Sequence, residues 1–237
     1  MTLSSSIAIV TGASKGLGTA ICMALVENNV KVYGIARSKD LLENLRNQLG
    51  EKFIPVSLDL TNRKKVKQWI DSEFKKEVPT ILINNAGAGS FAKIDEMPAL
   101  EWDSMIDINL HGMYNITAPV VSLMKKKAAG GYVINIGSIL GTTTRSEGAA
   151  YSATKYAIRG FSESLMKELR RDQIKVTCVN PGSIATQFFE SSGIEAHSNM
   201  LQPQELAETI IFLLKTPQNL LIDELTVRPL DARNPKK

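Results

Sequence analysis

The stretch "IAIVTGASKGLGTAI", residues 7–21, places three glycines and a lysine between two apolar runs. An apolar run, a glycine-rich turn and a second apolar segment together predict a buried strand, a tight turn and a helix. In an open parallel sheet, the first such turn commonly carries a phosphate, because glycines allow a close backbone approach and the helix directs free N–H groups at the anion. The stretch therefore predicts an anion-binding turn in an α/β protein, with a turn that binds nothing as the alternative.

The same alternation of strand and helix continues along the chain. The short apolar runs predicted as strands are "IAIV", "VKVYGIA", "FIPVSL", "TILIN", "GYVINIGS" and "IKVTCVN". Between them the apolar period changes to 3.6, as in residues 41–49 and 161–169, and a helix near residues 204–214 precedes a last strand near residues 225–227. This pattern predicts one α/β domain over residues 1–237, with a doubly wound parallel sheet of about seven strands and helices on both faces.

The composition limits the classes of protein that this chain can form. A chain of 237 residues with 43% hydrophobic content is large enough for one substantial core. Its formal charge of +4 comes from basic residues scattered among acidic ones, and only 6% of the residues are aromatic. Because a nucleic-acid-binding surface needs a basic stripe interleaved with aromatic residues, we expect no nucleic-acid partner.

The cysteines and the apolar runs bear on the cellular compartment. Cys22 and Cys178 lie in predicted elements with apolar neighbours, which predicts two buried, reduced thiols and no disulfide. No apolar run approaches the roughly 20 residues of a membrane helix, and the first predicted strand leaves no room for a signal peptide. We therefore expect a cytoplasmic protein with no membrane partner.

The glycine spacing and the later motifs resemble one superfamily. Gly12, Gly16 and Gly18 form T-G-x-x-x-G-x-G, the pattern of the short-chain dehydrogenase/reductase superfamily. The resemblance continues in order through "NNAG" (84–87), Asn109, Ser138, "YSATK" (151–155) and "NPGSIAT" (180–186). It implies a Rossmann fold, a nicotinamide cofactor and oxidoreductase activity. It also implies a homodimer or homotetramer in which the helices carrying Asn109 and Tyr151 pack across a two-fold axis.

Three of these positions can act on one oxygen atom. Tyr151 and Lys155 are four residues apart at the start of a predicted helix, so their side chains share a face. A nearby ammonium favours the phenolate, so we expect Lys155 to lower the pKa of Tyr151. Ser138 ends a predicted strand, where its hydroxyl would point into the cleft. The alternatives are an ordinary helix-surface pair and a serine that caps a turn.

The resemblance implies a role for each of these catalytic candidates. Tyr151 would protonate the substrate carbonyl as hydride arrives, or remove the alcohol proton in reverse, while Ser138 polarises the same oxygen. Lys155 would also hold the nicotinamide ribose. Asn109 would anchor a water molecule that relays protons to Lys155. His111 and His197 have no metal-ligand spacing with a cysteine or carboxylate, so we expect no metal.

The end of the second predicted strand bears on the choice of cofactor. NAD-binding relatives usually carry an acidic residue there, whereas this chain has Ala36 followed by Arg37. A guanidinium can bind a 2′-phosphate bidentately, and Lys15 in the glycine turn adds a second cation. This pair predicts NADP(H), with solvated surface charges and an NAD cofactor as the alternative.

The remaining cofactor residues are implied by motif position. Asp59 would contact the adenine amino group, with Leu60 beside the ring, and a third set would hold the nicotinamide carboxamide. The residues implied for the phosphate turn, the adenosine side and the carboxamide are, in that order, Gly12, Ser14, Lys15, Gly16, Leu17 and Gly18; Asn85, Ala86 and Gly87; and Pro181, Gly182, Ile184 and Thr186.

The substrate-binding region is expected in three segments: residues 183–200, residues 140–147 and the surroundings of Phe91. In the first segment, an apolar lid or a helix packed on the domain is predicted from four side chains: Phe188, Phe189, Ile194 and Met200. This segment contains no arginine pair, which would have indicated a carboxylated substrate.

These observations lead to the hypothesis of an NADP(H)-dependent oxidoreductase that interconverts a small carbonyl compound and its alcohol. A 3-oxoacyl-thioester reductase is an alternative, weakened by a C-terminus that lacks the glycine-rich "VDGG" ending of such reductases. An NAD-dependent alcohol dehydrogenase differs at Lys15, Ala36 and Arg37. The alternative from a different class is a protein that binds NADP(H) as a redox sensor without catalysis.

Overall fold

The computed structural model describes residues 3–128, 130–188 and 195–235 of the chain. Its centre is a seven-stranded sheet in the order β3-β2-β1-β4-β5-β6-β7, in which every neighbouring pair is parallel. The strands are β1 (Ile7–Thr11), β2 (Lys31–Ala36), β3 (Phe53–Ser57), β4 (Ile81–Asn84), β5 (Gly131–Ile136), β6 (Ile174–Pro181) and β7 (Glu224–Val227). The order reverses between β1 and β4, so the sheet is the doubly wound Rossmann type predicted from the sequence.

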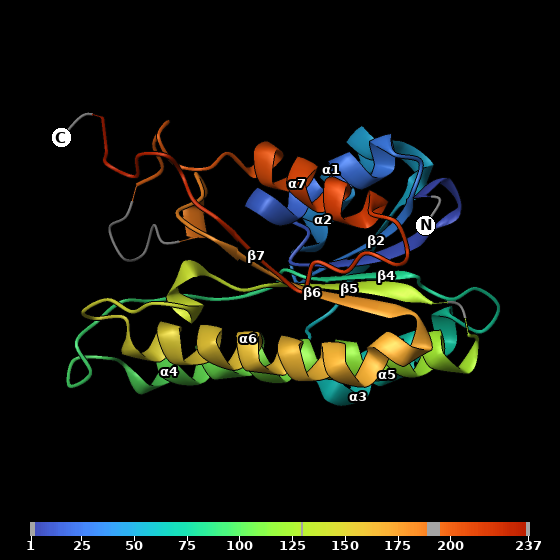
Figure 1. Ribbon diagram of the computed structural model, residues 1–237, viewed down its shortest axis with the longest axis horizontal. Helices are drawn as coiled ribbons and strands as arrows, with labels where there is room; N and C mark the ends of the chain where they lie inside the picture. Colours follow the sequence, from blue (N-terminus) through green and yellow to red (C-terminus); the bar gives the residue numbers. More distant parts are fainter. Residues whose placement is uncertain (1–2, 129, 189–194, 236–237) are drawn as a thin grey trace.

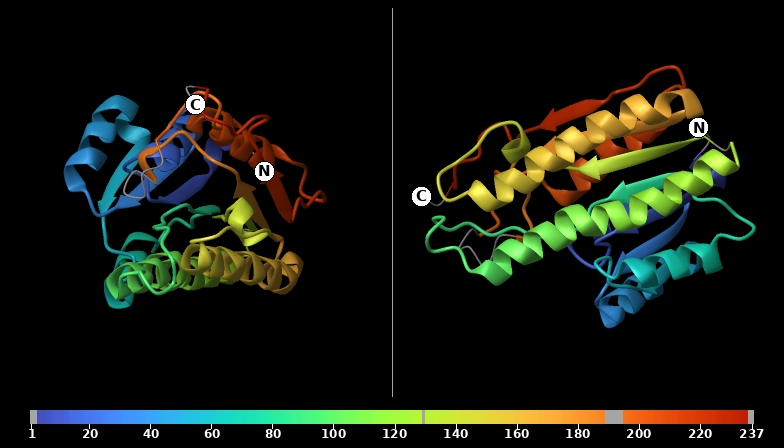
Figure 2. Two further views of the ribbon diagram at one scale, coloured as in Figure 1. Left: turned by 90° about the vertical axis from the view of Figure 1, so that its left-hand side faces the viewer. Right: turned by 90° about the horizontal axis from the view of Figure 1, so that it is seen from below.

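Helices cover both faces of the sheet (Figure 1). On one face lie α1 (Gly16–Glu27), α2 (Lys39–Leu49) and α7 (Pro203–Lys215). On the other lie α3 (Arg63–Glu73), α4 (Ala99–Ile106), α5 (Met113–Lys126) and α6 (Ala149–Leu169). A π-helical turn, η3 (Asp107–Gly112), joins α4 to α5, and this continuous run lies beside α6 (Figure 2). Helical layers on both faces bury the central strands of the sheet.

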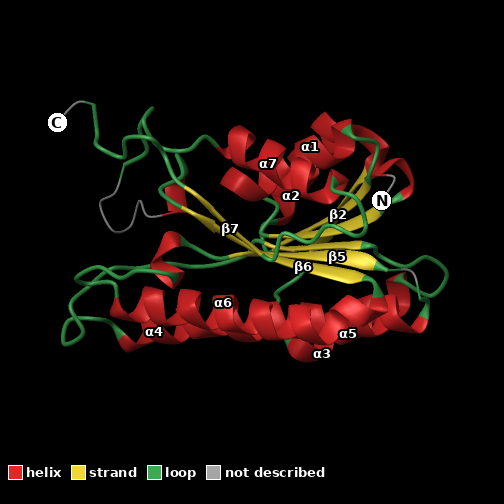
Figure 3. Cartoon of the chain, viewed as in Figure 1, coloured by secondary structure: helices red, strands yellow, loops and turns green. Residues whose placement is uncertain are grey.

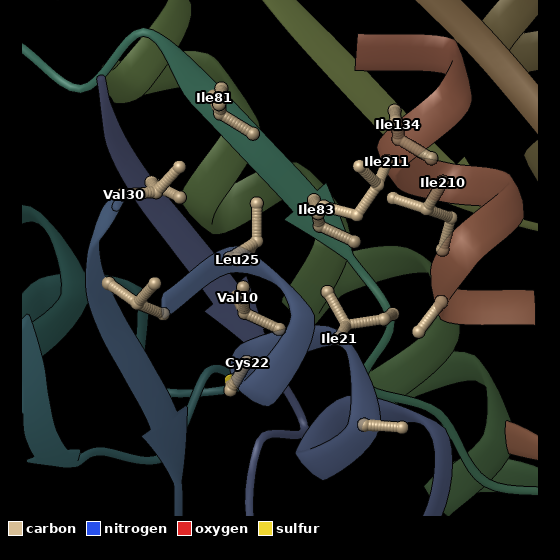
Figure 4. Close-up of a cluster of buried hydrophobic side chains, with 14 of the residues drawn as sticks. Val10, Ile21, Cys22, Leu25, Val30, Ile81, Ile83, Ile134, Ile210 and Ile211 are labelled. Atoms are coloured by element: carbon tan, nitrogen blue, oxygen red, sulfur yellow. The ribbon is translucent and has the colours of Figure 1, made fainter. Parts of the chain in front are cut away.

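The central strands are buried along almost their whole length, because a parallel sheet between two helical layers has no solvated face there, whereas the edge strands β3 and β7 are partly exposed. All eight residues of β6 and all six of β5 are buried. Figure 4 shows part of the layer beneath α1 and α7, where Val10, Ile83 and Ile134 of the sheet face Ile21 and Ile210 of these helices. The apolar runs of the sequence are thus strands, as expected.

Two amides lie on the opposite face of the sheet, toward α5 and α6, and bind each other. Asn84 of β4 and Asn135 of β5 are register partners, with exposed fractions of 5% and 0%. Asn84 Nδ2 donates to Asn135 Oδ1 at 2.7 Å and to Thr117 Oγ1 at 2.8 Å. Asn135 Nδ2 donates to Ser162 Oγ at 2.8 Å, which joins the strand pair to α6. These hydrogen bonds replace water around the two amide nitrogens and Asn135 Oδ1, whereas the buried Asn84 Oδ1 has no hydrogen-bond partner.

The two thiols are placed as the sequence predicts. Cys22 on α1 and Cys178 on β6 are both buried and free. Burial raises the pKa of the Cys22 thiol well above its usual range, so this thiol is neutral and unreactive in the folded protein. No helix in the described part of the chain is both long and apolar enough to cross a bilayer.

The loops that follow β4, β5 and β6 extend beyond one end of the sheet, shown in green in Figure 3. In parallel strands this is the carboxyl end, where ligands bind in open α/β sheets. The motifs singled out in the sequence fall at this end.

Candidate active site

A cavity of about 630 Å³ lies at the carboxyl ends of β1, β4, β5 and β6. It is within the usual range for ligand-binding pockets, roughly 300–1,000 Å³. The predicted residues that line it are Gly12, Lys15, Gly16, Leu17, Gly18, Asn85, Ala86, Gly87, Ser138, Tyr151, Lys155, Pro181, Gly182, Ile184 and Thr186. Gln187 and Phe188, both in the segment 183–200 expected to bind substrate, also line it, whereas sequence reasoning missed Ile136 and Gly137, which have no polar side chain that a motif would show.

The glycine turn after β1 is held against the loop after β4. Thr11 Oγ1 accepts from the backbone N–H groups of Asn85 and Ala86 at 2.9 and 3.0 Å. Asn85 Nδ2 donates back to Thr11 O at 2.9 Å. Gly12 has a φ of +67°, and a Cβ there would lie 2.9 Å from the Ala86 backbone. The turn therefore needs glycine at this position for both its conformation and its close approach.

The helix that follows this turn points its N-terminus at the cavity. Lys15 is the N-cap of α1 and provides no capping hydrogen bond from its side chain. Gly16, Leu17 and Gly18, the first residues of α1, all line the cavity. Free N–H groups and the positive end of the helix dipole there form a binding site for an anion such as a pyrophosphate. These residues fit the phosphates of a dinucleotide cofactor.

Arg37 and Asp59 lie outside the cavity lining but close to each other at the ends of β2 and β3. Hydrogen bonding from Thr61 holds the pKa of Asp59 below its usual value, and the charges of Arg37 and Lys65 add to this effect. Arg37 and Lys15 are exposed cations beyond the same edge of the sheet. This arrangement leaves the guanidinium accessible to an anionic group at the adenosine side.

Two other predicted cofactor residues, Leu60 and Ser14, do not line the cavity. The side chain of Leu60, expected beside an adenine ring, packs into the core with 4% exposure, and its carbonyl accepts from Asn115 Nδ2 at 2.9 Å. Ser14 is half-buried in the glycine turn and does not belong to the cavity lining.

Ser138, Tyr151 and Lys155 meet at the inner end of the cavity. Tyr151 and Lys155 lie one turn apart on α6, with exposures of 4% and 5%, and Lys155 Nζ is 5.5 Å from the centroid of the Tyr151 ring. Lys155 Nζ donates to Ile136 O at 3.0 Å, while Ser138 hydrogen-bonds the phenol of Tyr151. Ser138 Oγ also accepts from Leu140 N at 3.1 Å, so Ser138 caps the turn after β5 as well as facing Tyr151.

The expected effect of Lys155 on Tyr151 is not observed. Burial raises the pKa of the Tyr151 phenol above its usual range, opposed only by the hydrogen bond with Ser138. Burial also lowers the pKa of Lys155 to about 8, so desolvation dominates both groups. In this state the phenol is protonated at neutral pH and the amine is mostly charged.

Asn109 lies in the π-helical turn η3 and is 1% exposed. Its Oδ1 accepts from Ala88 N at 2.8 Å, and its Nδ2 donates to Ala88 O at 2.9 Å and to Thr154 Oγ1 at 3.0 Å. The side chain thus joins the loop after β4 to α6, next to Lys155. The water relay to Lys155 stays a prediction, and the observed contacts give Asn109 a positioning role.

A second cavity of about 160 Å³ adjoins the first at Ser138 and Tyr151. All three segments expected to bind substrate contribute to it, through Phe91, Leu140 and Met200 among others. Phe91 packs edge-on against Tyr151, with ring centroids 5.7 Å apart and an interplanar angle of 75°. Arg145, which sequence reasoning did not single out, also lines it.

The expected apolar lid is described only in part. Phe188 is 38% exposed, and its ring centroid lies 6.2 Å from that of Tyr151. Met200 is buried at 8% exposure. Phe189 and Ile194 lie outside the described residues. In the described ranges there is no cluster of three or more histidine, cysteine or acidic side chains that could hold a metal ion.

A sheet of this order, with a glycine turn at its switch point, defines a Rossmann-type nucleotide-binding protein. Residues 6–196 match the family described as short chain dehydrogenase. The chain is 36% identical over 235 residues to an uncharacterized oxidoreductase of Staphylococcus aureus (strain N315), covering 96% of this chain and 99% of that protein. The protein therefore belongs to the short-chain dehydrogenase family of oxidoreductases.

Solved structures of the family share this fold. A serine dehydrogenase in its closed form complexed with NADP+ superposes with a TM-score of 0.87 at 28% identity, covering 93% of this chain and 94% of its own. A 3-ketoacyl-(acyl-carrier-protein) reductase from Brucella melitensis complexed with NADH gives a TM-score of 0.85 at 25% identity, covering 96% and 98%. These similarities agree with a nicotinamide cofactor in the cavity.

Proposed function

We propose that this protein is an NADP(H)-dependent oxidoreductase that interconverts a carbonyl compound and its alcohol. The observation that carries the proposal is the meeting of Ser138, Tyr151 and Lys155 in one cavity that begins at the glycine turn. A bound nicotinamide cofactor supplies or accepts the hydride. The side chains of the protein must then hold the substrate oxygen and supply or remove its proton.

Tyr151 is the acid in the reduction direction. Its phenol is protonated at neutral pH, so it can donate a proton to the carbonyl oxygen. Ser138, which hydrogen-bonds the phenol, is positioned to donate to the same oxygen and polarise the carbonyl. The amine of Lys155, 5.5 Å from the Tyr151 ring centroid, is the charge that would stabilise the phenolate once the proton has left, and Asn109 positions Lys155 through its neighbour Thr154.

The first test is NADPH consumption by the purified protein with aldehydes, ketones, α-diketones, acetoacetyl thioesters and pterins. Tyr151→Phe should reduce turnover of any active class by about 100- to 10,000-fold, as for loss of a general acid. NADPH binding should stay within about twofold, because the removed hydroxyl is not a phosphate contact. Unchanged turnover in Tyr151→Phe would falsify the proposal.

A second candidate is a 3-oxoacyl-thioester reductase, favoured by the similarity to the Brucella melitensis reductase. The thioesters in the panel test this candidate directly. Tight NADPH binding with no turnover of any compound would instead indicate a non-catalytic redox sensor.

NADP(H) is the proposed cofactor because a guanidinium, Arg37, follows β2 where NAD-binding relatives carry a carboxylate. Lys15 adds positive charge at the glycine turn, and the serine dehydrogenase relative is complexed with NADP+. NADPH and NADH should be titrated side by side by quenching of the protein fluorescence. We expect NADPH to bind at least about tenfold more tightly, in line with a charged hydrogen bond to the phosphate. Equal affinities would contradict the proposed preference, and tighter binding of NADH would favour an NAD-dependent alcohol dehydrogenase.

The protein is further proposed to act on a small molecule as a cytoplasmic homodimer or homotetramer. Exposed aromatic side chains lie on the continuous α4–η3–α5 run, which carries Asn109, and on α6, which carries Tyr151: Trp102 on α4, Tyr114 on α5 and Tyr156 on α6. Packing of α4, α5 and α6 against a second copy would cover them. The two free, buried thiols are consistent with a reducing compartment. Light scattering coupled to size-exclusion chromatography distinguishes the monomer from either oligomer.

A further inference from the structure

The 160 Å³ cavity beside Tyr151 has one charged side chain among the described residues that line it, Arg145. Its other walls are mostly apolar or hydroxyl-bearing, and include Leu140, Ile184 and Met200. Ser138 and Tyr151, which act on the substrate oxygen in the proposed reaction, line the same cavity. A molecule bound there can therefore reach both the reacting groups and this guanidinium.

Arg145 is held in place by contacts on both sides of its side chain. Its Cζ lies 4.5 Å from the centroid of the Phe91 ring, and Phe91 in turn packs against Tyr151. A Cβ on Gly148 would lie 2.9 Å from Arg145 Cγ, so glycine at the N-cap of α6 leaves room for the arginine stem. Arg145 Nε donates to Ser146 O at 3.2 Å. The guanidinium thus loses less conformational freedom on binding a ligand than a free side chain would.

The charge of Arg145 is not neutralised by a neighbouring acid. Among the residues that the structure describes, no carboxylate forms an ion pair with Arg145. A guanidinium stays protonated at any physiological pH. Arg145 also lies just before the N-terminus of α6, whose dipole adds partial positive charge on the same side. The local potential favours an anion.

We propose that Arg145 binds the carboxylate of the substrate, and that the substrate class is a short oxo acid or its hydroxy acid. This inference rests on the proposed carbonyl and alcohol chemistry at Tyr151. The planar guanidinium matches a carboxylate in bidentate geometry. The cavity has the liquid volume of roughly five water molecules, which limits the bound part of the substrate to a few carbon atoms. The apolar walls cover the carbon chain between the carboxylate and the reacting carbon.

Acetoacetate and acetoacetamide provide a matched pair of probes, because the two have nearly the same shape and differ in charge. The kcat/KM of NADPH-dependent reduction is measured for both compounds with the wild type and Arg145→Gln. The wild type should prefer acetoacetate, and Arg145→Gln should lose roughly 10- to 100-fold in kcat/KM for acetoacetate, mainly through KM. The loss for acetoacetamide should be within about threefold, which reflects only the cation–π contact with Phe91.

Binding is measured separately from turnover. With NADP+ bound, the protein cannot reduce acetoacetate, so titration calorimetry of this complex reports the affinity of the carboxylate alone. Arg145→Gln should weaken this affinity by the same 10- to 100-fold factor, on the order of one charged hydrogen-bonded pair. Arg145→Lys should retain part of the affinity for acetoacetate, since the positive charge remains but the bidentate guanidinium geometry is lost.

The control variant is Arg63→Gln, which removes another arginine stacked on an aromatic ring. Arg63 Cζ lies 5.2 Å from the Tyr114 ring centroid, and neither residue lines either cavity. Arg63→Gln should leave kcat/KM unchanged for both acetoacetate and acetoacetamide. Equal losses for acetoacetate and acetoacetamide in Arg145→Gln would overturn the inference, and so would failure of the wild-type complex to bind acetoacetate. If acetoacetamide or another neutral ketone is still reduced in either case, the proposed function stands without the inference.

Discussion

The two cavities meet at Ser138 and Tyr151 but are built in different ways. The larger one is lined chiefly by residues at strand ends and at the start of α1, many of them glycines whose backbone forms the wall. The smaller one is lined by side chains from three loops that are far apart in the sequence, around Phe91, Leu140 and Met200. Backbone walls tolerate almost no change, whereas side-chain walls can be replaced one at a time. The comparison suggests that cofactor binding is rigidly specified and substrate choice is adjustable.

The largest effect is expected from a methyl group added to the backbone-lined cavity. A Cβ on Gly18 would lie 2.0 Å from Gly12 O and 2.7 Å from Asn85 Nδ2, so Gly18→Ala must displace backbone. We expect a loss of about 3 kcal/mol or more in the free energy of unfolding, and loss of NADPH binding. Urea denaturation and fluorescence titration measure the two effects.

The matched control for this change is Gly160→Ala on the exposed side of α6. A Cβ there meets nothing within 4 Å in its own chain, so helix propensity should stabilise the protein by about 0.5–1 kcal/mol when light scattering shows the same oligomeric state as the wild type. If both alanine variants behave alike, the glycine turn is not the tightly packed wall described above.

An intermediate effect is expected at the junction of the cavities, in Lys155→Met. Burial lowers the pKa of Lys155 from 10.5 to about 8, so the unfolded chain binds more protons than the folded one between these pH values. Wild-type stability should therefore rise with pH from 8 to 10.5, because the cost of burying the charge disappears. Lys155→Met, which has no such charge, should be more stable than the wild type at pH 7 by about 1 to 3 kcal/mol.

Urea unfolding of both proteins at pH 7, 8.5 and 10 measures this difference. The gap between the variant and the wild type should narrow as the pH rises, while the pH dependence of all other groups cancels. A gap that is independent of pH would show that Lys155 is not buried as a charged group.

The smallest effect is expected in the side-chain-lined cavity, in Phe91→Leu. This change removes the edge contact with Tyr151 and the ring beneath Arg145, but leaves an apolar wall. The kcat/KM for an active substrate should fall by about 2- to 10-fold, with NADPH affinity unchanged. Phe212→Leu on the exposed face of α7 serves as the control. A parallel loss of NADPH affinity in Phe91→Leu would show that the two cavities do not behave independently.

The fold could be predicted from the sequence because its signals are local. Continuous apolar runs mark strands buried on both faces, and the change of period to 3.6 marks the helices, as in α2 and α7. The cofactor turn was also predictable, since Gly12 and Gly18 are required by backbone geometry within a single segment. Tyr151 and Lys155 share a helix, so their common face follows from their spacing alone.

Features that depend on long-range packing could not be predicted. The pKa of Tyr151 depends on how deeply α6 is buried, which no spacing reveals, and desolvation outweighs the charge of Lys155. The side chain of Leu60 turns into the core because α5 lies beneath it. Arg145 is an exposed residue in a loop, and only the approach of Phe91, more than fifty residues away in sequence, gives it a binding role.

The paired amides of Asn84 and Asn135 bear on how the chain reaches this structure. If β4 and β5 paired one residue out of register during folding, each amide would face an apolar partner with no hydrogen bond, at a cost of about 1–3 kcal/mol apiece. A slip would also shift Ser138, three residues beyond Asn135, by about 3.3 Å relative to β4. The amide pair therefore favours the native register of β4 and β5 over a one-residue slip, and with it the position of Ser138 beside the other reacting groups.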